Sequence, residues 1–287
     1  MKKIFASILI ALVIGTIASC GKTNDDKKVT IAYVNWAEGV AMTQLSKVLL
    51  EKEGYTVALK NADVAPVFAA VAGGDADVFL DTWMPVTHKE YLDKFGANLE
   101  VLGTNFKNAR IGFVVPEYVK ISSIEDLNVN AKLFNGKIVG IDAGAGIMNK
   151  AEQAIKDYEL KLELQSSSEA AMLAVLKKSI DAKAPIVITG WAPHYIFSTY
   201  KLKFLNDPKA VFGAVESIQT VANKHFVAAK PKVAEFFRNF QLDEAELSSL
   251  MAALESNTNE KVAVVEWLAK HQELELQLRS FIKSDTE

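Results

Sequence analysis

Three tryptophans occupy equivalent positions in this chain and could together hold a cation. Trp36, Trp83 and Trp191 each end a short apolar run rich in β-branched residues, and each run leads into a helical pattern. Runs of this kind predict buried strands. Because ligands of open parallel sheets bind beyond the carboxyl ends of the strands, the three indoles predict an aromatic-walled pocket. Such a pocket suits a cation that cannot donate hydrogen bonds, since ring faces combine a negative quadrupole with apolar contact.

A glycine-rich segment could bind an anion. Residues 140–148 read GIDAGAGIM, which predicts a strand that turns into a helix. Gly144 and Gly146 let the backbone approach a ligand closely, and N–H groups at a helix start attract a carboxylate. We expect the N–H groups of Gly146 and Ile147 to serve this role. The third glycine of a dinucleotide fingerprint is missing, so a dinucleotide is not expected. A turn that binds nothing is the alternative.

His88 is a further candidate for the anion site. It follows Trp83 by five residues and could donate a hydrogen bond to a carboxylate. A histidine at such a place is otherwise typical of an exposed helix start, and the spacing from Trp83 is what favours a role in binding. His194 and Tyr195 could form a second layer around the pocket. Trp267, in contrast, lies on an apolar helical stripe that predicts a core residue.

Motifs for catalysis and metal binding are absent from the sequence. It contains no Gly-x-Ser-x-Gly elbow and no His-Glu-x-x-His zinc motif. Asp75, Asp77 and Asp81 lack the glycine and the terminal glutamate of a calcium loop. The single cysteine, Cys20, excludes an intrachain disulfide and a multi-cysteine metal site. We therefore expect no catalytic residue, no metal, no cofactor and no enzymatic activity.

Residues 1–19 predict a signal peptide. Lys2 and Lys3 precede an apolar run over 4–17, which is shorter than the roughly 20 residues of a membrane-spanning helix. Small residues then precede Cys20, in a pattern that resembles the bacterial lipobox, whose cysteine is lipidated. Residues 20–28 are polar and predict a lipidated tether. Ordinary secretion with a chance cysteine is the alternative.

The charge of the chain argues against a nucleic-acid partner. Removal of residues 1–19 takes away Lys2 and Lys3, so the net charge of −3 becomes −5. Nucleic-acid-binding domains usually present a basic face, and this balance gives no support for one. The remaining chain is long enough for a large core in one or two domains.

The order of strand and helix patterns predicts two similar α/β lobes. Both halves read strand, helix, strand, helix, strand, tryptophan, which favours mostly parallel sheets flanked by helices. We assign residues 29–112 to the first part of lobe 1, 113–214 to lobe 2, and 215–287 to a return crossover and the C-terminal helices of lobe 1. A strand at 111–115, separate from one at 101–105, is expected to cross between the lobes.

Five motifs together resemble the glycine betaine substrate-binding proteins of osmoprotectant ABC importers, over roughly residues 29–280. The resemblance implies a two-lobed periplasmic-binding-protein fold of type II, with two crossover strands as a hinge, that closes on its ligand. By motif match, Trp36, Trp83 and Trp191 would cage the quaternary ammonium, and His88, Gly146 and Ile147 would hold the carboxylate. The motifs are Asn35-Trp-Ala-Glu38, Asp63-Val-Ala-Pro66, Trp83-Met-Pro-Val-Thr-His88, the segment 140–148 and Thr189-Gly-Trp-Ala-Pro-His194.

The resemblance also implies partners and a location. It suggests a lipid-anchored extracytoplasmic receptor, expected to be a monomer, that delivers a betaine to an ABC permease and ATPase. Tyr195 departs from the pattern, because some relatives carry a second tryptophan there, so glycine betaine, proline betaine, carnitine and choline stay open as ligands. Choline lacks the carboxylate that the anion site would need. The rivals are a receptor of this fold for an amino acid or polyamine, an anchored hydrolase, and an osmolyte sensor.

Overall fold

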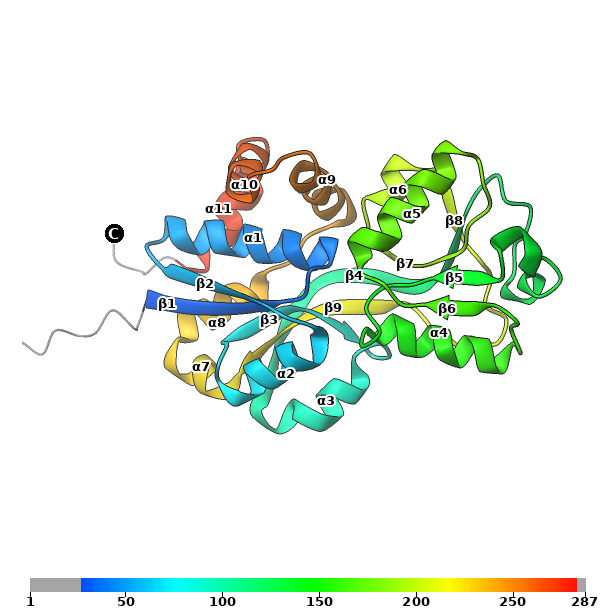
Figure 1. The fold of residues 1–287 in the computed structure, drawn as a ribbon. Helices are drawn as coiled ribbons and strands as arrows, with labels where there is room; N and C mark the ends of the chain where they lie inside the picture. Colours follow the sequence, from blue (N-terminus) through cyan, green and yellow to red (C-terminus); the bar gives the residue numbers. More distant parts are fainter. Residues whose placement is uncertain (1–26, 283–287) are drawn as a thin grey trace, which may run out of the picture.

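The chain forms two α/β lobes joined by two antiparallel strands (Figure 1). This computed structural model describes residues 27–282. The predicted signal peptide, Cys20 and most of the predicted tether lie outside the described residues. Within residues 27–282, no helix combines the length and the apolar character that a membrane crossing requires.

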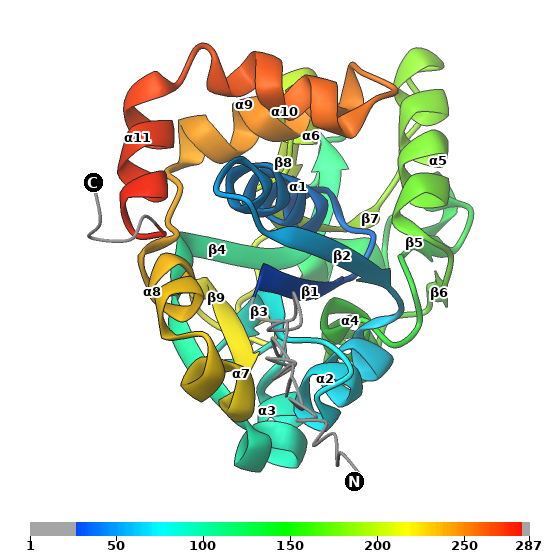
Figure 2. The same cartoon turned by 90° about the vertical axis from the view of Figure 1, so that its left-hand side faces the viewer.

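The first lobe alternates strands and helices, as the sequence patterns predict. Its strands β1, β2 and β3 are mutually parallel, so their carboxyl ends lie at one edge of the sheet. The helices cover both faces of this sheet, with α1 on one side and α2 on the other (Figure 2). In chain order the elements are β1 (Lys28–Tyr33), α1 (Ala37–Lys52), β2 (Thr56–Asn61), α2 (Val64–Gly73), β3 (Val78–Met84) and α3 (Lys89–Phe95).

The second lobe repeats this arrangement on a smaller scale. Strand β5 pairs in parallel with β6 and with β7, and α4 and α5 flank the sheet (Figure 1). Its elements are β5 (Lys137–Val139), α4 (Gly146–Asp157), β6 (Glu163–Gln165), α5 (Glu169–Asp181), β7 (Ile188–Ala192), α6 (Ile196–Thr199) and β8 (Leu202–Phe204).

Strand β4 (Leu99–Pro116) is the longer of the two strands that link the lobes. It pairs with β9 (Glu216–Asn223) up to Ala109 and with β7 from Arg110 onward. The sequence predicts two short strands here, because the polar stretch between them breaks the apolar pattern. In the structure the polar stretch stays in the strand, with register shifts against β9 and a positive φ of 64° at Asn108. The sheet order is β2-β1-β3-β9-β4-β7-β5-β6, and β8 lies off this path and pairs with β4.

The C-terminal helices pack on the first lobe. Helices α9, α10 and α11 contact α1 (Figure 2), and α8 contacts β4. Trp267 on α10 is buried in this layer, as the sequence predicts, and its indole N–H donates to Ser249 at 2.9 Å. These helices are α7 (Lys224–Ala229), α8 (Pro231–Asn239), α9 (Glu244–Glu255), α10 (Glu260–Leu268) and α11 (Gln272–Ser280).

Candidate ligand-binding site

A pocket between the lobes brings together all six residues that the sequence analysis singles out. Its empty space is about 280 Å³. Both lobes and the linking strand β4 contribute to the wall, so a molecule held here would contact both halves of the protein. The lining residues are Trp36, Glu38, Trp83, Thr87, His88, Ile111, Ile141, Ala145, Gly146, Ile147 and Trp191.

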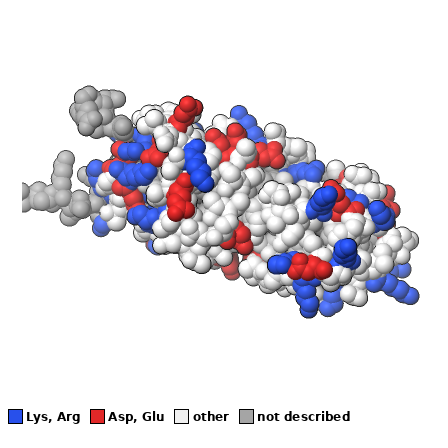
Figure 3. Space-filling model, turned by 90° about the horizontal axis from the view of Figure 1, so that it is seen from above, with Lys and Arg blue, Asp and Glu red and all other residues white. Residues whose placement is uncertain are grey.

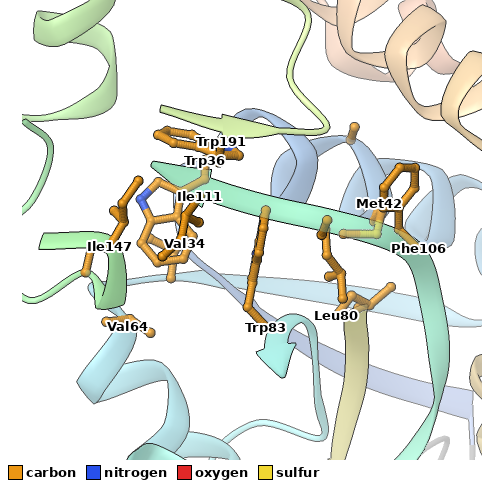
Figure 4. Packing of buried hydrophobic residues seen from close by; sticks show 14 of the residues in the cluster. Val34, Trp36, Met42, Val64, Leu80, Trp83, Phe106, Ile111, Ile147 and Trp191 are labelled. Atoms are coloured by element: carbon orange, nitrogen blue, oxygen red, sulfur yellow. The ribbon is translucent and has the colours of Figure 1, made fainter. Parts of the chain in front are cut away.

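The three tryptophans wall the pocket from three elements. Trp36 caps the start of α1, Trp83 lies in β3 and Trp191 lies in β7. Each indole is at most 5% exposed. Figure 4 shows Trp36 beside Ile147, with Trp191 above them and Trp83 on the side away from Ile147. Only Trp36 follows its strand; β3 and β7 extend through Trp83 and Trp191, because the buried runs continue past the expected strand ends.

Two of the indoles are fixed by buried carboxylates. The Trp83 Nε1–H group donates to Asp81 Oδ1 at 2.8 Å, and the Trp191 Nε1–H group donates to Glu38 Oε2 at 2.8 Å. The Trp36 Nε1–H group is buried and has no partner among the described residues. Since Trp191 and Glu38 come from different lobes, one of these bonds spans the pocket.

The hydrogen bonding of His88 assigns its proton. The His88 Nδ1 atom accepts from the backbone N–H of Trp83 at 3.0 Å, which explains the five-residue spacing of the pair. Burial lowers the pKa of His88 to about 3, so the ring is neutral at physiological pH. A neutral ring that accepts at Nδ1 carries its hydrogen on Nε2. This Nε2–H group is buried and has no hydrogen-bond partner within residues 27–282, although the backbone of Asp81 acts on the ring and partly opposes the lowering of its pKa. His88 itself lines the pocket.

An aromatic group holds the His88 ring in place. Trp36 stacks on it at a centroid distance of 5.9 Å and an interplanar angle of 16°. Phe68 meets it edge-on at 5.7 Å, and Tyr91 does so at 5.9 Å. The donor at Nε2 is therefore oriented by packing as well as by the bond to Trp83.

The start of helix α4 provides further donors. Gly146 and Ile147 are its first two residues, after Ala145 as the N-cap. The first N–H groups of a helix have no acceptor within the helix, and both residues line the pocket. A Cβ on Gly146 would lie 2.3 Å from the backbone oxygen of Thr87, so only glycine permits this approach of the lobes.

Glu216 at the start of β9 supports the turn that carries His88. Its carboxylate accepts from the backbone N–H groups of Val86 and Thr87, each at 2.8 Å, and from the Thr87 hydroxyl. Glu216 is 3% exposed. The turn between Trp83 and His88 is thus anchored to a strand that links the lobes.

A group of acidic residues surrounds the start of α1. Glu38 lies in its first turn, Asp81 contacts Gly39, and Glu169 on α5 accepts from the Ala37 N–H at 3.1 Å. Burial, with repulsion from Asp81 and Glu169, raises the pKa of Glu38 well above its usual value. Burial, opposed by the Trp83 hydrogen bond, raises the pKa of Asp81 to about 7.

The lobes touch at several points around the pocket. Besides the bonds from Trp191 to Glu38 and from Ala37 to Glu169, the Tyr91 hydroxyl donates to the Gly144 carbonyl at 3.0 Å. These contacts, with the close approach of Gly146 to Thr87, close the two lobes over the pocket.

The two residues proposed for a second layer contact each other, with ring centroids 4.8 Å apart, but only His194 contacts a pocket tryptophan ring. His194 is buried, meets Trp191 edge-on at 4.9 Å and lies 3.0 Å from Glu169 Oε1. Tyr195 does not line this pocket; it lies at a separate surface cleft near Glu255. No group of three His, Cys, Asp or Glu residues in the described chain could hold a metal ion.

Several pocket and support residues were not predicted from the sequence. Glu38 follows Trp36 by two residues, and Asp81 precedes Trp83 by two, so proximity to a pocket tryptophan was a usable signal for both. Glu169 and Glu216 carried no such signal, because their partners are far away in sequence. Ile111, Ile141 and Ala145 resemble ordinary core residues in sequence.

Comparisons with known proteins agree with this geometry. Residues 27–270 match the profile of the OpuAC family, described as the substrate binding domain of ABC-type glycine betaine transport systems. The glycine betaine/carnitine transport binding protein GbuC of Listeria monocytogenes is 42% identical over 137 residues, which cover 47% of this chain and 46% of that protein. The matched region thus spans less than half of that relative.

Solved structures extend the likeness to the whole fold. Lactococcal OpuAC, in a closed conformation with glycine betaine, is 34% identical with a TM-score of 0.84, covering 90% of this chain and 100% of that chain. The glycine betaine/L-proline-binding protein ProX of Borrelia burgdorferi is 33% identical with the same score and coverage. A choline-binding protein at 23% identity, also with a TM-score of 0.84, shares the fold.

The family match covers most of the chain, and two structures above 30% identity are covered in full. The family consists of binding domains, not enzymes, and has the mixed α/β periplasmic-binding-protein fold. The chain therefore belongs to the family of substrate-binding domains of ABC-type glycine betaine transport systems.

Proposed function

We propose that the chain is an extracytoplasmic receptor that binds glycine betaine between its lobes and delivers it to an ABC importer for osmoprotection. The observation that carries this proposal is the pocket itself. It combines three indole walls, at Trp36, Trp83 and Trp191, with N–H donors at His88, Gly146 and Ile147. A quaternary ammonium joined to a carboxylate needs both kinds of group.

The ammonium would lie among the indoles. Its methyl groups cannot donate strong hydrogen bonds, and each well-placed aromatic face contributes up to about 2 kcal/mol when the pair is desolvated. The carboxylate would accept hydrogen bonds from the His88 Nε2–H group and from the first N–H groups of α4, whose dipole favours an anion. Because the donors and the indoles come from both lobes, the ligand favours the closed state by its differential affinity for it.

Carnitine is the second candidate ligand. It carries both the trimethylammonium and the carboxylate, and the Listeria monocytogenes relative is described as binding glycine betaine and carnitine. Choline fits less well, because it has no carboxylate to accept from the buried His88 Nε2–H group. A buried donor left without an acceptor costs about 1–3 kcal/mol.

Anchoring and partners belong to the same proposal. Lipidation of Cys20 would hold the domain at the membrane through the short polar segment up to Lys28, within reach of the permease and ATPase. We expect a monomer that binds no nucleic acid. In support, Figure 3 shows basic and acidic side chains interspersed over both lobes, without a continuous basic stripe on the face in view.

Calorimetric titration of the mature domain tests the proposal. We expect saturable binding of glycine betaine, weaker binding of choline and none of glycine, whose primary ammonium needs hydrogen-bond acceptors. Carnitine binding without glycine betaine binding would keep the pocket assignment and change the ligand. If no quaternary ammonium compound binds, the proposed function is wrong. In Cys20→Ala, loss of palmitate incorporation together with release of the protein from the membrane would test the anchor separately.

A further inference from the structure

The two carboxylates behind the cage have no structural need for a charge. Asp81 and Glu38 each accept one indole N–H group. A neutral amide would orient an indole as well as a carboxylate does. Burial of an ionised carboxylate costs several kcal/mol unless other groups compensate. Asp81 and Glu38 are each 1% exposed, so both sit where such a charge is expensive.

Their surroundings compensate the charges only in part. The Asp81 Oδ2 atom has no hydrogen-bond partner among the described residues. It lies against the first turn of α1, where a Cβ on Gly39 would be 2.7 Å away. The positive end of this 16-residue helix favours nearby anions. Within residues 27–282, the carboxylates of Asp81 and Glu169 raise the pKa of Glu38, and that of Glu169 raises the pKa of Asp81. The imidazole of His194 faces this group, with its Nε2 atom 3.0 Å from Glu169 Oε1.

A cation in the pocket would supply the missing compensation. Glu38 itself lines the pocket, and Asp81 contacts it through the Trp83 indole. An indole whose N–H group donates to an anion is polarised toward a more negative ring face, because hydrogen bonds in series reinforce one another in a medium of low dielectric. Both effects attract a positive charge and neither attracts an uncharged group.

We propose that Glu38 and Asp81 form an anionic layer, acting directly and through the indole N–H groups of Trp191 and Trp83, which makes the pocket select a positively charged trimethyl head over a neutral one of the same shape. This inference rests on the proposed betaine function and assigns its charge selectivity to two positioning residues. Trp36, whose indole N–H group has no partner, contributes shape and its own quadrupole only.

A carbon isostere of glycine betaine separates charge from shape. In 3,3-dimethylbutanoate a tert-butyl group replaces the trimethylammonium, and the carboxylate is kept. Calorimetry with both ligands on wild type, Asp81→Asn and Glu38→Gln measures the affinity ratio. We expect wild type to prefer glycine betaine at least tenfold. Each substitution should lower the affinity for glycine betaine about tenfold, equivalent to roughly 1.4 kcal/mol. The affinity for the isostere should be equal to that of wild type or higher.

Asp77→Asn is the matched control. Asp77 precedes the same strand, about 13 Å from Asp81 along it, and accepts from Thr30 N–H away from the pocket. This variant loses a carboxylate from the same lobe and should leave both affinities unchanged. If Asp81→Asn and Glu38→Gln lower the affinities for both ligands by the same factor, the carboxylates only orient the indoles and the inference is wrong.

A pH series on wild type provides a test without substitutions. As the pH falls from 8 to 5, protonation of Glu38 and Asp81 should lower the affinity for glycine betaine. The affinity for the isostere should stay the same or rise. A constant ratio of the affinities for glycine betaine and for the isostere over this pH range would also overturn the inference. Binding of glycine betaine with a constant ratio leaves the proposed function intact, whereas absence of any betaine binding refutes the function itself.

Discussion

The indole N–H group of Trp191 on the second lobe donates a 2.8 Å hydrogen bond to Glu38 on the first lobe. One wall of the cage is therefore fixed by the lobe opposite its own. When the lobes separate, this bond is broken and the wall loses its orientation. Cage assembly and lobe closure are one event, so a ligand that needs the complete cage stabilises the closed state.

Substitution of Trp191 should separate the aromatic wall from this interlobe bond. Trp191→Phe keeps a ring but removes the donor to Glu38, and hydrogen bonds to charged groups contribute about 1.5–3 kcal/mol. We expect glycine betaine affinity to fall roughly tenfold. Trp191→Ala removes the ring as well and should weaken binding by one to two orders of magnitude. Calorimetry measures both, and an unchanged affinity of Trp191→Ala would refute the cage.

Substitution of His88 should act on the carboxylate end of the ligand alone. In His88→Asn the side-chain oxygen can replace Nδ1 as the acceptor for Trp83 N–H, while the donor at Nε2 is lost. We expect glycine betaine to bind roughly 10-fold or more weakly, as for a lost charge-assisted bond. Choline affinity should change little, because choline has no carboxylate. Equal losses for both ligands would mean that the variant disturbs the cage.

The elements that carry the site were predictable because their signals are local. Buried β-branched runs, the glycine-rich turn and the helical stripes depend on neighbours in sequence. They placed Trp36, Trp83 and Trp191 at strand ends and Gly146 at a helix start. The structure brings these positions to one pocket. The role of each in binding stays a prediction.

The supporting carboxylates were not predictable because their partners are distant in sequence. Glu169 accepts from Ala37, and Glu216 accepts from Thr87, across 132 and 129 residues. No local pattern distinguishes these residues from solvated acids. The same holds for β4, whose polar middle looks like a loop until β9 pairs with it. Tertiary contacts decide these features, so only the folded chain shows them.

Gly146 offers a test of closure, because Gly146→Ala keeps the backbone N–H group that the proposed carboxylate site uses. An added Cβ would lie 2.3 Å from the Thr87 backbone oxygen, which belongs to the other lobe. Gly146→Ala should therefore prevent full closure and weaken glycine betaine binding at least tenfold. Alanine favours helices over glycine by up to about 1 kcal/mol, so the free energy of unfolding without ligand should not fall.

Two measurements check this expectation for Gly146→Ala. Small-angle scattering with saturating ligand should show a larger radius of gyration for the variant than for wild type. Gly144→Ala is the matched control, since no atom lies within 4 Å of a Cβ at that position. Normal closure and affinity in Gly146→Ala would show that the lobes can adjust around the extra methyl group.

Asp81 should couple the stability of the ligand-free protein to pH. Its pKa is raised from 3.8 to about 7, mainly by burial, and that of Glu38 is raised in the same direction. At a pH between about 4 and 7, Asp81 holds a proton in the folded state and has released it in the unfolded state. Stability without ligand is therefore highest at the acidic end and falls as the pH rises from about 4 to 7.

Urea unfolding at pH 5 and pH 8 without ligand measures this dependence. Asp81→Asn removes a charge that is buried without full compensation, so it should raise the free energy of unfolding at pH 8 by about 1 kcal/mol or more and reduce the pH dependence. Asp181→Asn, which changes an exposed ion pair with Lys177, should do neither. Glycine betaine should restore stability at pH 8 in wild type more than in Asp81→Asn, because its cation compensates the carboxylate that the variant lacks. A variant that is less stable than wild type at pH 8 would show that the Asp81 charge stabilises the lobe, and that it is not held there for a cation.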